Sequence, residues 1–382
     1  MKNDINYFNE THYQVKNSIE KFVSNEITPF INEWEDACEF PREIYTQAGS
    51  LGFLGIGYPE KFGGTSEGDI FMKIAASEAL MKSTSGGLVA SLGSIDIGLP
   101  PVLLWGSDEL KEKVIPAAIR GEKICALAIT EPNAGSDVAN IRTRAIKEGD
   151  HYRVNGSKMF ITSGVRADYY TVAVRTGADG YGGISLLLIE KGTPGFTVGR
   201  KLKKMGWHAS DTAELFFEDC LVPASNLIGQ ENGGFLCIMT NFMKERLFLC
   251  VMAYMTAQIA LDEALNYVKQ REAFGRPIGK YQVIRHKLVD MATEVEIARE
   301  FTYRVAAKMQ ANQTPIKEMA MAKNFATDVA EKTTREAVQI FGGMGYMQES
   351  VVERLYRDAK ILSIGGGTTE IMKEMIAKQM KL

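Results

Sequence analysis

The sequence predicts an α+β protein with three successive domains: a helical N-terminal domain, a middle β-barrel-like domain and a helical C-terminal bundle. Hydrophobic spacing is helical at both ends of the chain and changes to short β-branched and aromatic runs between them. No helix-length periodic segment interrupts those runs, which excludes an alternating βαβ fold. A length of 382 residues suits two or three domains, and we expect their boundaries at 1–123, 124–230 and 231–382.

The N-terminal domain is predicted from apolar side chains that recur near the 3.6-residue helical period. These side chains are Tyr13, Ile19, Phe22, Val23, Ile27 and Phe30. Pro41 is expected to open the next helix, because proline suits a first helical turn. Several glycines and a proline between residues 52 and 64 predict a loop.

The middle domain is predicted from five short runs separated by glycine, asparagine and aspartate. The runs are Ile124–Thr130, Met159–Ser163, Tyr169–Arg175, Ile184–Glu190 and Ala213–Phe217. From Gly233 onward helical spacing returns, with breaks near residues 275–277, 313–315, 342–345 and 365–367. The third block is therefore expected to be a helical bundle.

One helical stripe in this third block carries a carboxylate among apolar residues. Phe242, Glu245, Leu249 and Met252 follow one another at steps of three and four. A glutamate in such a stripe would be desolvated, which raises its pKa toward a value that suits a general base. A solvated glutamate on a long helix is the alternative.

Charge and cysteine usage exclude several function classes. Lys and Arg total 44 against 47 Asp and Glu, a formal charge of −3 that offers no field for nucleic acid. The five cysteines are widely spaced without a CxxC pair, so we expect reduced thiols and no metal site. The N-terminus lacks a signal or transit pattern and no 18-residue apolar run is found, so we expect a cytoplasmic protein without a membrane span.

Two polar stretches follow strand ends in the middle domain. Ala128–Asp137 and Lys158–Ser163 place hydroxyl groups, backbone N–H groups and one aromatic ring where a flat polar ring or a phosphate could bind. A plain turn remains the alternative. Gly64–Gly68 matches the GxSxG pattern of hydrolases, but a turn and not a strand precedes it, so we expect a surface loop there.

These two stretches resemble the acyl-CoA dehydrogenase family. Further stretches match in the family's order: Tyr58–Gly64, Arg271–Ile278, Gln339–Tyr346, Arg357–Lys360 and Gly367–Ile371. The resemblance implies the family's three-domain fold, FAD as cofactor and an acyl-CoA substrate. It also implies a homotetramer built as a dimer of dimers, and electron-transferring flavoprotein as the electron acceptor.

The resemblance also implies the cofactor-binding residues. The residues expected around the flavin ring are Leu127, Ile129, Thr130, Ser136, Phe160 and Thr162. The residues expected to reach the ADP half of FAD bound to the other subunit of a dimer are Arg271, Phe274, Gln282, Gln339 and Gly343. Thr368 and Glu370 are expected to close over the cofactor from the C-terminal segment. Ser136, Arg246 and Gly365 are expected to contact substrate, and Arg246 alternatively orients its helix.

Many family members carry the catalytic glutamate in a Tyr-Glu-Gly-Thr turn, where this chain has Gly365-Gly366-Gly367-Thr368. The long-chain and isovaleryl-type branches instead place the base on a helix before an arginine, as in Glu245-Arg246. We therefore expect Glu245 to abstract the α-proton and the Gly366 N–H to polarise the thioester oxygen.

The missing tyrosine at Gly365 suggests space for a branch or a wider chain, and we expect a medium-to-long or methyl-branched acyl-CoA as substrate. An oxygen-using acyl-CoA oxidase-like enzyme and a catalytically silent acyl-CoA-binding flavoprotein remain alternatives.

Overall fold

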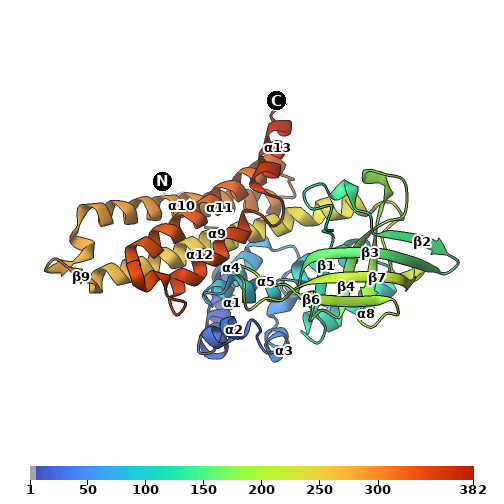
Figure 1. The fold of residues 1–382 in the computed structure, drawn as a ribbon, viewed down its shortest axis with the longest axis horizontal. Coiled ribbons are helices and arrows are strands. Elements are labelled where there is room, and N and C mark those ends of the chain that lie inside the picture. The colour runs from blue at the N-terminus through green and yellow to red at the C-terminus, as the bar shows by residue number, and fades with distance from the viewer. Residues whose placement is uncertain (1–5) are drawn as a thin grey trace.

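The computed structural model describes residues 6–382, which form two helical parts and a sheet (Figure 1). The N-terminal helices occupy the lower centre of the view, the sheet lies to the right, and the C-terminal helices extend to the left. The N-terminal helices are α1 Glu10–Phe22, α2 Ile31–Ala37, α3 Glu43–Ser50, α4 Ile70–Met81, α5 Gly86–Leu92, α6 Ile95–Gly98, α7 Pro100–Trp105 and α8 Asp108–Ile119.

The middle part is an eight-stranded sheet. Its strands are β1 Cys125–Ala128, β2 Arg144–Glu148, β3 His151–Thr162, β4 Tyr169–Arg175, β5 Ile184–Glu190, β6 Phe196–Lys201, β7 Thr212–Pro223 and β8 Leu227–Ile228. The strand order is β6-β7-β3-β2-β4-β5-β8, and β1 pairs with β4 in parallel. The sequence predicted β4 and β5 with these bounds, but it missed β2, β6 and β8.

The expectation of a barrel-like middle domain is wrong in one respect, because the sheet is not closed. Its path has two free ends, at β6 and at β8. The two halves meet where β2 pairs with β4 through one residue pair, Arg144 and Arg175. A junction this short lets the chain bend without continuing the hydrogen-bonded ladder around a full circle.

The C-terminal part is a bundle around the longest helix of the structure, α9. Its helices are α9 Gly234–Gln270, α10 Gln282–Gln310, α11 Ile316–Phe341, α12 Val351–Leu362 and α13 Thr369–Gln379, and a short hairpin of β9 Glu272–Ala273 and β10 Arg276–Pro277 joins α9 to α10. Helix α9 packs against α10, α11 and α12 of the bundle and against α4 of the N-terminal part.

Helix α9 also corrects the expectation about apolar runs. It contains an 18-residue window with mean hydropathy 1.3, long and apolar enough by composition to cross a membrane. However, 78% of that window is buried inside the protein. The apolar character of α9 is therefore that of a core helix, covered by its neighbours on several sides. All five cysteines are free, as expected.

Candidate active site

The Glu245 side chain meets the Gly365–Gly367 turn that follows α12. A Cβ atom added to Gly366 would lie 3.5 Å from Glu245 Oε1 and 2.6 Å from Leu249 Cδ1. A carboxylate attached at either position would therefore enter the same space. The two elements that the sequence identified as alternative carriers of the base converge in the structure.

The environment of Glu245 is that of a carboxylate poised to accept a proton. Its Oε2 atom is buried, and neither carboxylate oxygen has a hydrogen-bond partner among residues 6–382. Burial raises the pKa of Glu245 to about 7, against the opposing effect of the Arg246 and Lys323 charges. A general base with a pKa near 7 binds a proton strongly, and a large fraction of it is still deprotonated and ready to react at neutral pH.

Two buried cations hold the glycine turn. Arg246 Nε donates to Gly366 O at 2.9 Å, and Lys323 Nζ, from α11, donates to Gly367 O at 2.8 Å. Lys323 is completely buried, and burial lowers its pKa to about 8. Arg246 thus orients the turn from its own helix. Sequence reasoning missed Lys323, although a lysine on the apolar face of α11 was a detectable signal.

The carbonyl groups of this turn are held, but one N–H group is free. In the described part of the chain the Gly366 N–H donates to no acceptor. The backbone of Gly366 has a φ of +64°, a conformation that glycine adopts readily. A Cβ added to Gly365 would meet only Ile361 O within 4 Å. The turn therefore offers a backbone donor beside Glu245 and space next to it.

The two polar stretches predicted to cradle the flavin lie at strand ends, and their chemistry fits a flat polar ring. Phe160 is 63% exposed at φ +62°, at an irregularity in the β3–β7 pairing that turns it out of the sheet. Such backbone strain in a bulky residue is concentrated at functional sites. The hydroxyl groups of Thr130, Ser136 and Thr162 have no hydrogen-bond partner among the residues that the structure describes.

A buried ion pair fixes these strand ends relative to each other. Lys158 Nζ lies 2.8 Å from Glu131 Oε1 and also donates to Ile129 O at 3.0 Å. Glu131 accepts two further hydrogen bonds, from the N–H groups of Arg142 and Thr143. Both residues belong to the stretches singled out in the sequence, but their pairing was not anticipated.

Helix α6 connects the cradle to the base. On one side the Thr171 hydroxyl of β4 donates to Gly98 O at 2.7 Å, and β1, which leads into the cradle, pairs with β4. On the other side Asn241 Nδ2, one helical turn before Glu245, donates to Ile97 O at 2.8 Å. The same short helix therefore carries hydrogen bonds to both halves of the site.

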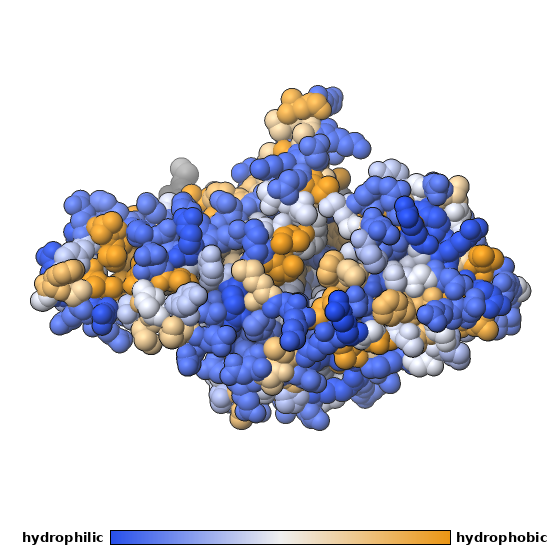
Figure 2. All heavy atoms as spheres, in the orientation of Figure 1, coloured by the Kyte–Doolittle hydropathy of each residue, from blue (hydrophilic) through white to orange (hydrophobic). Residues whose placement is uncertain are grey.

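The residues expected to reach the ADP half of FAD lie far from this cradle in the same chain. They surround the hairpin β9–β10 and the end of α11, at the opposite end of the bundle from the sheet (Figure 1). Phe274 is 96% exposed there, and hydrophobic residues appear on this end of the surface in Figure 2. Arg271, Gln282 and Gln339 are exposed, and Gly343 follows α11.

Thr368 and Glu370, the residues expected to close over the cofactor, lie at the start of α13, apart from both groups above. The Thr368 hydroxyl caps this helix by accepting from the Ile371 N–H at 3.3 Å, and Glu370 is exposed in its first turn. Leu127 and Ile129, by contrast, lie with the cradle, half-buried and buried. Within one chain, α6 is hydrogen-bonded both to β4 next to the predicted flavin-ring residues and to the helix of the predicted base, whereas the predicted ADP contacts lie at the far end of the bundle.

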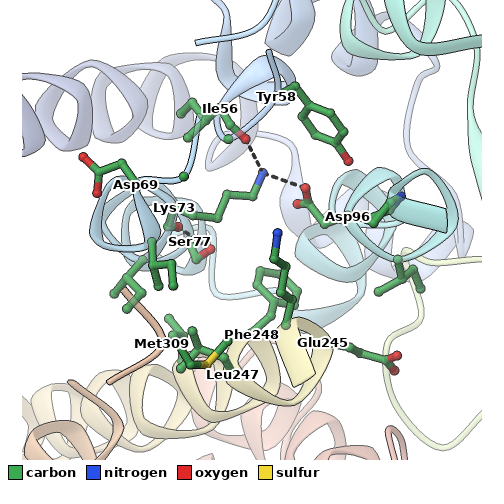
Figure 3. Close-up of a pocket in the computed structure, with 18 of the residues that line it drawn as sticks. Ile56, Tyr58, Asp69, Lys73, Ser77, Asp96, Glu245, Leu247, Phe248 and Met309 are labelled. Atoms are coloured by element: carbon green, nitrogen blue, oxygen red, sulfur yellow. Dashed lines mark hydrogen bonds and ion pairs between the residues drawn. The ribbon is translucent and has the colours of Figure 1, made fainter. Parts of the chain in front are cut away.

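A cavity opens beside Glu245 between α4, α6, α7 and α9, with an empty volume of about 930 Å³ counted out to solvent. Its walls are mainly apolar side chains, including Ile70, Leu103, Phe248 and Met309. Glu245 lies at one end of this cavity (Figure 3), with its carboxylate directed away from the interior. The cavity suits a mainly apolar acyl chain whose reacting end lies near Glu245.

The succession of helical, sheet and helical parts, with a buried carboxylate beside a glycine turn, is the three-domain class that the sequence resemblance implies. Residues 9–122, 126–220 and 232–381 match the sequence profiles of the acyl-CoA dehydrogenase N-terminal, middle and C-terminal domains. The chain belongs to the acyl-CoA dehydrogenase family, whose members are flavoproteins that oxidise CH–CH bonds.

Individual relatives match over nearly the whole chain. An acyl-CoA dehydrogenase of Bacillus subtilis is 41% identical over 96% of this chain and 97% of its own length. The mouse mitochondrial long-chain specific acyl-CoA dehydrogenase is 40% identical over 98% of this chain and 87% of its own. A solved structure of a probable acyl CoA dehydrogenase from Mycobacterium abscessus is 50% identical with a TM-score of 0.96, covering 98% of this chain and 100% of that one.

Proposed function

We propose that this enzyme desaturates an acyl-CoA thioester between its α and β carbons, with Glu245 as the base that takes the α-proton. The observation that carries this proposal is that a side chain at Gly366 would begin 3.5 Å from the Glu245 carboxylate. Glycine has no carboxylate to offer there, so Glu245 is the acid that occupies this space. The buried Oε2 and the pKa near 7 support the same role.

FAD, when bound, would supply the hydride acceptor for the β carbon. The chain's own groups are suited to the other requirements of the reaction. The unpaired hydroxyls and the Phe160 ring are suited to hold the flavin of FAD, and the Gly366 N–H is suited to donate to the thioester oxygen as negative charge develops there. Lys323 and Arg246 keep that N–H in place through the neighbouring carbonyls.

We further infer that a second copy of this chain completes the FAD site, as in a dimer of dimers. The support is the separation of Arg271, Phe274, Gln282, Gln339 and Gly343 from the cradle and their exposure. Electron-transferring flavoprotein is the proposed acceptor and the cytoplasm the proposed location. A medium-to-long or methyl-branched acyl group is the proposed substrate class.

The test compares Glu245→Gln with Glu263→Gln, a control glutamate also on α9 that does not line the cavity. Both variants are expected to purify with bound flavin. On anaerobic mixing with a panel of acyl-CoAs, Glu263→Gln should bleach the flavin at the wild-type rate, whereas Glu245→Gln should be slower by about 10²- to 10⁴-fold, the usual contribution of a general base. Wild-type bleaching in Glu245→Gln would refute the assignment.

The same experiment separates the two alternatives. A catalytically silent flavoprotein would bind acyl-CoA without bleaching in the wild-type protein. An oxidase-like enzyme would bleach and then release peroxide in air at the turnover rate. Bleaching followed by slow reoxidation in air and fast reoxidation by electron-transferring flavoprotein is the result expected here.

A further inference from the structure

The cavity beside Glu245 contains an ion pair among mainly apolar side chains, and Asp69 and Lys244 also contribute to its wall. Lys73 Nζ, from α4, lies 2.8 Å from Asp96 Oδ1, from α6, and donates to Ile56 O at 3.3 Å. Figure 3 shows these two contacts, with Leu247, Phe248 and Met309 across from them. Both charged side chains line the cavity and remain partly exposed, at 28% and 21%.

This pair has unused hydrogen-bonding capacity. A lysine ammonium has three donors and Lys73 uses two of them, while a carboxylate accepts at both oxygens. The Tyr58 hydroxyl donates to Ile95 O at 3.0 Å and also lies within reach of the Asp96 carboxylate, whose other partner among residues 6–382 is Lys73. The charge of Asp96 adds to burial in raising the Tyr58 pKa well above its usual value. One donor and one carboxylate oxygen are therefore left for the cavity.

A plain hydrocarbon chain would leave the free hydrogen-bonding groups of Lys73 and Asp96 without a partner. Filling the cavity with methylene groups would remove the water that solvates the pair and supply no hydrogen bond in exchange. A charged group matches the pair itself less well, because either charge would be repelled by one of its two members. Lys244 and Asp69 also line the cavity, so an ω-carboxy chain is the competing ligand that the experiment has to include. A hydroxyl group both donates and accepts, so it matches the free oxygen of Asp96 and the free donor of Lys73 together.

We propose that the Lys73–Asp96 pair selects acyl chains that carry a hydroxyl group remote from the thioester. This inference rests on the proposed function and names its substrate class. The hydroxyl belongs to the distal part of the chain, because Glu245 stands at the end of the cavity with its carboxylate turned away from the pair (Figure 3). The α and β carbons react there, and the chain beyond them reaches Lys73 and Asp96.

The experiment uses the flavin-loaded enzyme and three acyl-CoA series of matched length: saturated, ω-hydroxy and ω-carboxy. Anaerobic flavin bleaching gives kcat/KM or its single-turnover equivalent for each. At one chain length the ω-hydroxy compound should exceed the saturated one by about tenfold or more, the effect of a hydrogen bond to a charged group. A ratio of one or below at every length, or a preference for the ω-carboxy series, would overturn the proposal.

A paired variant tests whether Lys73 and Asp96 cause the preference. Lys73→Met with Asp96→Leu replaces both charges by apolar groups, avoiding a lone buried charge. The hydroxyl preference should fall to about one, with saturated chains improved. Lys113→Met with Glu190→Leu removes a surface ion pair outside the cavity and should leave the preference unchanged. Absence of bleaching with all three series in the wild-type enzyme would reject the proposed function itself, whereas bleaching without a hydroxyl preference rejects only this inference.

Discussion

Moving the base from α9 to the glycine turn is the sharpest test of the site geometry. In Glu245→Gln with Gly366→Glu, the new carboxylate would start from a Cβ that lies 3.5 Å from the old Oε1 position. The same Cβ lies 2.6 Å from Leu249 Cδ1, and the φ of +64° is unfavourable for glutamate. Backbone strain and overpacking should together destabilise this double variant by roughly 3 kcal/mol.

Adding Leu249→Ala removes the clash while the new glutamate fills part of the vacated volume. The triple variant is therefore expected to melt at a higher temperature than the double variant and to regain flavin bleaching at least about tenfold above Glu245→Gln, because a positioned base is worth 10²-fold or more. Thermal unfolding followed by flavin fluorescence and stopped-flow bleaching give the two measurements. A triple variant with full flavin content and no recovered bleaching would show that the two positions do not serve one reacting atom.

Three further outcomes follow from contacts described above. Because burial raises the pKa of Glu245 to about 7 and the base acts deprotonated, kcat/KM should rise with pH through about 7 and level off above it; a profile flat from pH 5 to 9 contradicts this base. Lys158→Met leaves Glu131 buried without its cation and should cost about 3 kcal/mol of stability. Flavin should be lost as well, which absorbance at 450 nm and thermal unfolding will measure. Phe274→Asp alters a side chain that is 96% exposed within one chain, so the fold should persist. If Phe274 contributes to the proposed dimer interface, light scattering should show a smaller particle and absorbance should show less flavin. An unchanged oligomer with full flavin would place the partner surface elsewhere.

The sequence was most informative where a segment is apolar throughout. Strands β4 and β5 were predicted with their observed bounds, because they are buried along almost their whole length and contain few polar residues. Strand β2, with the sequence RAIKE, has one buried residue in five and becomes a strand through its pairing with β3. Nothing in its own composition distinguishes it from a loop, so only the three-dimensional pairing identifies it.

The same contrast holds at the site. Glu245 could be proposed because it lies in an apolar stripe on one helix and because the family resemblance implies a base just before an arginine on this helix; the stripe by itself left a solvated glutamate open. The part played by Lys323 depends on how α11 packs against α9 and on where the turn after α12 lies, which are contacts between distant segments. The positive φ of Phe160 likewise depends on an irregular pairing of β3 with β7. Local patterns identify candidates, whereas long-range packing decides their geometry.

The apolar window of α9 has a consequence for how the chain must be made. Synthesis completes α9 before α10, α11 and α12 exist, so that only α4 among its main partners is available when it leaves the ribosome. Until the last third of the chain follows, the nascent protein displays a helix with the composition of a membrane segment. A chain that stops after Gln270 should therefore aggregate or bind lipid, and chaperones that shield apolar helices should associate with the translating ribosome at this stage.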